Sequence, residues 1–192
     1  LDSLGLILAG LGLITPTIDY GLKKNLSRWL SIGASLVAIA LSVGLLSVTS
    51  SNGFTLIYGG ALKIDSYGAF LFTVASLGTF LVTLASFKQT RKWTTAPSYF
   101  SLVLLTLAGV YFLISVNDLV LLLSAWALVS VASYAIVAVR KDEGSLEGAS
   151  KYALMGITAS AFMLFGIAIL YGVTGSTDIN GIVRAASTSG SP

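Results

Sequence analysis

Residues 117–152 read NDLVLLLSAWALVSVASYAIVAVRKDEGSLEGASKY, and this stretch decides the fold. Residues 119–139 form an uncharged run, residues 140–147 form a charged turn, and a second apolar run begins after Lys151. At about 1.5 Å per residue, the first run is long enough to cross a hydrocarbon core of roughly 30 Å. We therefore predict a transmembrane helix followed by a loop at the membrane surface.

The composition of the whole chain is that of an integral membrane protein. Its 192 residues are 55% hydrophobic and 10% charged, with a mean hydropathy of +0.90, whereas soluble proteins carry about 25% charged residues. This leaves too little polar surface to cover a water-soluble globule. The chain has no Cys and no His, which excludes disulfides, thiolate chemistry, imidazole metal sites and a Ser-His-Asp triad.

The same composition argues against bound cofactors and nucleic acid. The chain offers no Cys for an iron–sulfur cluster, no His for haem, and no Gly-rich strand-to-helix loop for a nucleotide. The net charge of +3 is not gathered into the basic stripe that nucleic-acid binding requires. We expect this chain to bind no metal, no cofactor and no nucleic acid.

Six apolar stretches predict an all-α membrane protein with a single transmembrane domain. The predicted helices cover residues 4–22, 29–48, 66–87, 97–116, 119–139 and 152–171, and residues 172–192 are expected to form a loop. In the second helix, Ala34, Ala38 and Ser42 are spaced four apart, which lets a neighbouring helix approach closely. The alternative is that small residues recur by chance in an Ala-rich helix.

A small β-hairpin is predicted between the second and third helices. Residues 54–65 read FTLIYGGALKID, in which two short β-prone runs flank Gly59 and Gly60. Glycine adopts the positive φ angles that a tight hairpin turn requires. We expect the hairpin to lie on the membrane surface.

The distribution of basic residues predicts the orientation in the membrane. The loops after the first, third and fifth helices lie on one side of the predicted bundle, together with the foot of the sixth helix. The opposite side holds only Lys63 and Arg184. The first side contains Lys23, Lys24, Arg28, Lys88, Arg91, Lys92, Arg140, Lys141 and Lys151. By the positive-inside rule, the basic loops face the cytoplasm and both termini face outward. We expect a prokaryotic cell membrane, with an organellar energy-converting membrane as the alternative.

Ionisable residues near the helices are candidates for function, because a charge at the bilayer centre costs at least about 2.5–3.5 kcal/mol. Helices two to six contain none, and capping explains Asp19 and Asp118 at helix ends. Lys151 is predicted to open the sixth helix, where a cation opposes the helix dipole. Glu147 could pair with Lys151 if the helix begins near Ser145. The alternative is an interfacial lysine that extends towards water.

The second half of the chain carries a motif that resembles the antiporter-like membrane subunits of complex I, and most closely subunit N, the ND2-type chain. In that family a basic turn is followed by E-A-x-x-K-Y-x-x-x-G-x-x-x-S and then by L-x-G-x-x-x-L-Y-G-x-T-G-S-T-D. The corresponding residues here are Glu147, Gly148, Lys151, Tyr152, Gly156, Ser160, Phe165, Gly166, Leu170, Tyr171, Gly172, Thr174, Gly175, Ser176, Thr177 and Asp178. The resemblance extends over most of the chain and is weakest before Phe54.

This resemblance implies a fold of about fourteen helices with inverted repeats, and a half-channel in which a helix-five carboxylate pairs with a lysine on a broken helix seven. The carboxylate position, seven residues before Tyr134, is Ala127. Ser130 and Tyr134 lie on the same helix face and can pass a proton through hydrogen bonds. A neutral hydroxyl cannot store charge at pH 7, so the electrostatic switch is incomplete. The proton-path candidates are Lys151, Glu147, Ser130 and Tyr134.

The resemblance leaves three functions open. The first is a membrane-arm subunit of a complex-I-like, redox-driven proton-translocating oxidoreductase, with no redox chemistry of its own. Its partners would be other membrane-arm subunits, and partner subunits would carry the iron–sulfur clusters and quinone site. The second is a cation/proton antiporter subunit of the Mrp type, which the signature of residues 171–178 disfavours. The third is a non-conducting structural or assembly subunit, which Ala127 favours.

The length of the chain adds one more expectation. The family's broken helix seven and its lysine would come after Pro192. We expect the sequence to be part of a longer subunit, with a natural six-helix remnant as the alternative.

Overall fold

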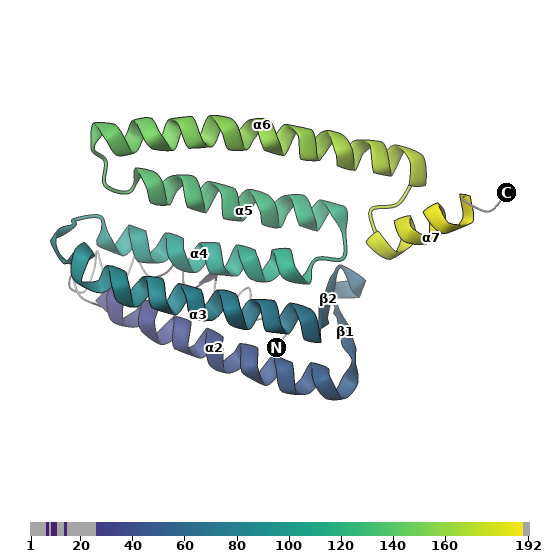
Figure 1. Cartoon of the computed structure of the whole chain (residues 1–192), viewed down its shortest axis with the longest axis horizontal. Helices are drawn as coiled ribbons and strands as arrows, with labels where there is room; N and C mark the ends of the chain where they lie inside the picture. The colour runs from purple at the N-terminus through teal and green to yellow at the C-terminus, as the bar shows by residue number, and fades with distance from the viewer. Residues whose placement is uncertain (1–6, 8, 11–13, 15–25, 190–192) are drawn as a thin grey trace.

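The long apolar stretches form a bundle of helices that lie side by side (Figure 1). The computed structural model describes residues 7, 9–10, 14 and 26–189. Within this part of the chain, five helices are long and apolar enough to cross a membrane: α2 (Leu26–Asn52), α3 (Ser66–Gln89), α4 (Ala96–Ser115), α5 (Leu119–Ala138) and α6 (Glu143–Thr174). The predicted class of all-α membrane protein is confirmed. The first predicted helix, residues 4–22, lies largely outside the described residues.

The predicted hairpin is confirmed between α2 and α3. Strands β1 (Phe54–Ile57) and β2 (Leu62–Asp65) pair antiparallel, with Phe54 opposite Asp65. Gly59 and Gly60 in the connection have φ angles of 69° and 96°, a conformation that glycine adopts without steric cost. The turn chemistry of the sequence therefore produces the observed register.

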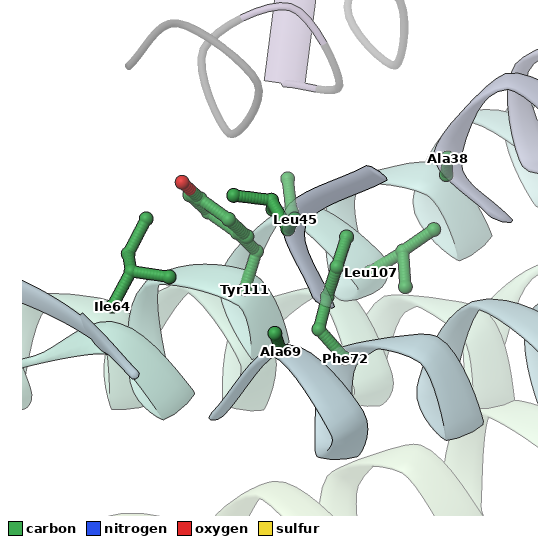
Figure 2. Close-up of a cluster of buried hydrophobic side chains, with 8 residues drawn as sticks. Ala38, Leu45, Ile64, Ala69, Phe72, Leu107 and Tyr111 are labelled. Atoms are coloured by element: carbon green, nitrogen blue, oxygen red, sulfur yellow. The ribbon is translucent and has the colours of Figure 1, made fainter. Parts of the chain in front are cut away.

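Three helices and the hairpin enclose the hydrophobic core. Figure 2 shows its side chains, which come from α2, β2, α3 and α4. At its centre the rings of Phe72 and Tyr111 meet edge to face, with centroids 5.0 Å apart, an arrangement that aromatic pairs favour. Ala38 and Ser42 on α2 are fully buried and Ala34 nearly so, which confirms that the small residues face a neighbouring helix.

Aspartate side chains set the first residue of three helices. Asp65 accepts a hydrogen bond from the Gly68 N–H, at 2.7 Å, ahead of α3. Asp118 accepts from the Val120 and Leu121 N–H groups in the first turn of α5, and Asp142 accepts from the Ser145 N–H in α6 at 2.8 Å. Such caps satisfy N–H groups that have no partner inside the helix. They explain why α3, α5 and α6 begin directly after these aspartates.

Helix α6 begins at Glu143, so the predicted start at residue 152 is wrong. Its 32 residues extend over about 48 Å, well beyond a hydrocarbon core of roughly 30 Å. The apolar run marks only the segment within lipid, whereas the Asp142 cap starts the helix two turns earlier. Glu143, Glu147 and Lys151 thus belong to the helix and not to a loop.

The prediction that residues 172–192 form a loop is also wrong. Helix α6 continues to Thr174 and ends at Gly175, which has a left-handed φ of 65°. A further helix, α7 (Ile179–Ser189), follows. Its 11 residues are too few to span a membrane, and they lie at the same end of the bundle as the hairpin (Figure 1).

Candidate functional site

The candidate residues lie on α5 and α6, which pack along each other (Figure 1). The Tyr134 ring on α5 meets the Tyr152 ring on α6 edge to face, with centroids 4.8 Å apart. Ser133 Oγ donates a hydrogen bond to the Tyr152 hydroxyl at 3.2 Å. Farther along, Trp126 Nε1 donates to Ser160 Oγ at 3.1 Å. We refer to these five residues as the α5–α6 seam.

Gly156 lets the two helices approach at the centre of the seam. A Cβ atom at this position would overlap the Tyr134 hydroxyl and Cζ, so the ring lies directly on the backbone of α6. Ser160 Oγ donates to the Gly156 carbonyl at 2.9 Å, next to the same contact. The Tyr134 hydroxyl is therefore held at a fixed place between the helices.

The predicted pair of Lys151 and Glu147 is confirmed. Lys151 Nζ lies 2.5 Å from Glu147 Oε1, and both side chains are exposed. The position of Lys151 within the helix differs from the prediction, because α6 begins at Glu143 and Lys151 is its ninth residue. The helix dipole acts mainly within the first turn, so it does not oppose this cation. Neither side chain is covered by another part of the described chain.

The seam itself contains no group that is charged at neutral pH. Its members are serine, tyrosine and tryptophan, whose side chains are neutral hydrogen-bonding groups. Ala127 follows Trp126 on α5 and is exposed. Ser130, a predicted candidate, is half-buried and contributes its carbonyl, which accepts from Ser133 Oγ at 2.7 Å. The chemistry that these side chains offer is therefore hydrogen bonding by neutral groups, with no carboxylate or ammonium among them.

Sequence reasoning did not single out Trp126, Ser133, Tyr152, Gly156 and Ser160 as one site. A signal for the α6 members was present, because Tyr152, Gly156 and Ser160 recur every four residues and share one helix face. The partners on α5 could not be assigned from spacing alone, since the rotation of α5 against α6 is a tertiary property.

Cationic side chains lie at the end of the bundle where α5 connects to α6. Arg140 pairs with Asp142 at 3.1 Å and lies over the Trp93 ring, 5.8 Å from its centroid. The hydroxyl and N–H of Ser145 lower the pKa of the Asp142 carboxyl, which Arg140 lowers further.

In the described part of the chain, no cluster of three acidic side chains could hold a metal ion.

The chain is similar to membrane proteins of respiratory complexes. Residues 116–191 match the family described as NADH:quinone oxidoreductase/Mrp antiporter, transmembrane region. The F(420)H(2) dehydrogenase subunit N of Methanosarcina mazei is 34% identical over 181 residues, covering 91% of this chain and 37% of the relative. The NADH-quinone oxidoreductase subunit N of Rubrobacter xylanophilus is 31% identical over 159 residues, covering 82% of this chain and 32% of the relative.

Two solved structures contain a chain with the same fold. One is the membrane-bound sulfane sulfur reductase, an archaeal respiratory membrane complex, with a TM-score of 0.85, 25% identity, and coverage of 97% of this chain and 39% of the other. The second is respiratory complex I from Thermus thermophilus, with a TM-score of 0.75, 26% identity, and coverage of 91% and 38%. The chain thus spans between 32% and 39% of the length of these relatives. Over most of its length it is similar to the antiporter-like membrane subunits of complex I, and residues 116–191 carry the transmembrane region of that family.

Proposed function

We propose that this chain is part of a membrane-arm subunit of a complex-I-like, redox-driven proton-translocating oxidoreductase. One observation carries the proposal: the Lys151–Glu147 pair lies on α6 in the same helical turn as Tyr152 of the seam, which follows Lys151 in the chain. Both features lie within the segment that matches the family. A group that exchanges protons with water therefore adjoins a line of hydroxyl groups between two membrane helices.

In this proposal, the ion pair takes up or releases a proton and the seam passes it along. Hydroxyl groups donate and accept hydrogen bonds at once, so Tyr152, Ser133 and Tyr134 can order water between α5 and α6. Because position 127 is alanine, α5 supplies no carboxylate to bind the proton. The direction of transfer must then be set by charges outside this seam.

A non-conducting structural subunit is the second candidate function. Ala127 favours it, since the chain lacks a titratable group at the position where the family's half-channel has one. An antiporter subunit of the Mrp type is the other alternative, because the matched family covers both kinds of protein. Ion flux measured with this chain alone in liposomes would support the antiporter, whereas the complex requires its partners.

The proposal extends to partners and location. The relatives belong to multisubunit respiratory complexes, and we infer that this chain packs against other membrane-arm subunits. Partner subunits would carry iron–sulfur clusters and a quinone site, and this chain would bind no cofactor. We place it in a prokaryotic cell membrane, or an organellar energy-converting membrane, with the basic end of the bundle in the cytoplasm and both termini outside.

Replacement of Lys151 by alanine tests the proposal in the assembled complex. We expect Lys151→Ala to reduce proton translocation into vesicles more strongly than electron transfer, because it removes the group that exchanges protons next to the seam. Lys151→Arg keeps the cation and serves as the matched control, and it should retain more coupling. If the protons translocated per electron are unchanged in Lys151→Ala, the lysine is merely interfacial and the proposed proton entry is wrong.

A further inference from the structure

A cavity of 560 Å³ lies at the end of the bundle opposite the basic loops. It is formed where the hairpin, the α4–α5 turn and α7 meet, and Figure 1 shows these three elements at the same end. Pockets of roughly 300–1,000 Å³ are the size that small ligands occupy. The α5–α6 seam contributes no residue to this cavity.

The walls of the cavity are held together by one buried side chain, that of Asn117. Asn117 Nδ2 donates to the Gly60 carbonyl in the hairpin at 2.9 Å and to Asp178 Oδ1 at 3.0 Å. Its Oδ1 accepts from Asn180 Nδ2 in α7 at 3.1 Å. The backbone adds hydrogen bonds from Asn117 to Ala61 and from Ile179 to Asn117. The cavity is therefore a built feature of the fold.

The lining carries charges of both signs. Lys63 on β2 and Arg184 on α7 supply two cations, and Asp118 and Asp178 supply two carboxylates. Burial raises the pKa of Asp118, but hydrogen bonds from the Thr177 hydroxyl and from backbone N–H groups outweigh it and hold the pKa below its ordinary value of 3.8. Asp118 is thus ionised at neutral pH, and the cavity suits a ligand that has both a negative and a positive group.

Apolar side chains adjoin these charges. Phe54 and Leu56 also line the cavity, lie two residues apart on one face of β1 and are more than half exposed. Lys63 Nζ lies 5.3 Å from the centroid of the Phe54 ring. The cavity thus places charged groups beside exposed apolar side chains, at the end of five spanning helices. This combination suits an amphiphile from the bilayer, which has a charged headgroup and apolar chains.

We propose that this cavity binds the headgroup of a zwitterionic phospholipid of the phosphatidylethanolamine type. The phosphate contacts Lys63 and Arg184, since cations bind phosphate through charged hydrogen bonds, and the ammonium group contacts Asp118 and Asp178. The acyl chains run along Phe54 and Leu56. A purely anionic headgroup is disfavoured, because the two carboxylates would repel it. The site is independent of the proposed proton path.

Native mass spectrometry of the purified protein in detergent tests this site by titration with phosphatidylethanolamine. We expect the wild-type protein to retain one such lipid, and Lys63→Gln to weaken apparent binding about tenfold, the change expected for one lost charged hydrogen bond. Arg184→Gln should weaken it similarly. Lys63→Arg keeps the cation and should bind close to wild type. Lys88→Gln, at the opposite end of the bundle, is the matched control and should bind normally.

Two further compounds, added to the protein in separate titrations, test the source and the charge of the ligand. Soluble phosphoethanolamine at the same concentration should not displace the lipid, because it lacks the acyl chains. Phosphatidylglycerol should bind more weakly than phosphatidylethanolamine. Equal lipid retention by wild type and both glutamine variants would overturn the proposal, and so would displacement by phosphoethanolamine or equal binding of phosphatidylglycerol. Proton translocation is not read out, so this result is separate from the test of Lys151.

Discussion

Position 127 on α5 is alanine, and it directly follows Trp126, whose side chain binds α6. Trp126 donates to Ser160 across the interface, whereas Ala127 is exposed and has no polar atom in its side chain. The residues nearby that can take part in proton transfer are neutral hydroxyls, and Lys151 and Glu147 lie at the membrane-surface end of the seam. We therefore infer that the chain provides a route for protons without a store for them.

Ala127→Glu tests whether position 127 lies on a working path. We expect this variant to change the number of protons translocated per electron in the assembled complex, because a carboxylate binds and releases a proton where alanine cannot. The measurement is proton uptake into vesicles during quinone-linked turnover. Ala127→Gln has nearly the same shape without the charge and should leave the yield unaltered. An identical yield for the Glu variant would place the position outside any proton path.

The contact between α5 and α6 depends on one small residue. Helix α6 packs mainly against α5 among the described elements, and most of its apolar side chains are exposed. The Tyr134 ring fits against Gly156, and its edge-to-face contact with Tyr152 fixes its direction. Between membrane helices, close packing of this kind takes the place of the hydrophobic driving force.

Gly156→Ala should loosen this pair of helices. The added Cβ overlaps the hydroxyl and Cζ of Tyr134, so the whole ring has to move, at a cost of about 1–3 kcal/mol that is typical of overpacking. Thermal unfolding in detergent, followed by circular dichroism, measures the loss. Gly166→Ala is the matched control on the same helix, because a Cβ there meets no atom within 4 Å, and it should be neutral or stabilising.

A double variant separates packing from helix propensity. Gly156→Ala combined with Tyr134→Ala removes the overlapping ring, so the two changes together should cost less than the sum of the single changes. Simple additivity would show that the ring and the glycine are not coupled, contrary to the contact described above.

The whole molecule is asymmetric in charge along the axis of the bundle. The last turn of α3 and the connections after α3 and α5 carry Lys88, Arg91, Arg140 and Lys141, whereas Lys63 and Arg184 at the other end lie beside Asp118 and Asp178. The net positive charge therefore lies at the end of the bundle that holds the connections after α3 and α5. From the positive-inside rule we propose that this end faces the cytoplasm.

Labelling of single cysteines tests the orientation, and the absence of natural Cys makes each variant report on one place. Thr94→Cys lies in the connection before α4 at the basic end, and Ser187→Cys lies in α7 at the other end, both at exposed positions. We expect a membrane-impermeant maleimide to label Ser187→Cys in intact cells. Thr94→Cys should react only after permeabilisation, and the reverse pattern would contradict the orientation.

The sequence by itself determined the membrane class, the long apolar helices after residue 26, and the hairpin turning at Gly59 and Gly60. Each depends on local chemistry: length of an apolar run, propensity for strand, and freedom at positive φ. The pairing of Lys151 with Glu147 was also predictable, because helix geometry brings residues four apart together.

Tertiary structure decided the rest. The cavity at Asn117 depends on segments more than fifty residues apart, whereas the early start of α6 follows from a local contact, the Asp142 cap on Ser145, that the apolar run alone does not indicate. The seam depends on how α5 is rotated against α6, which Gly156 permits and the Tyr134 ring selects. Apolar periodicity predicts which residues enter lipid, but only the packing between helices determines which of them contact each other. That is why Ser133, Tyr152 and Ser160 join the site only in the folded chain.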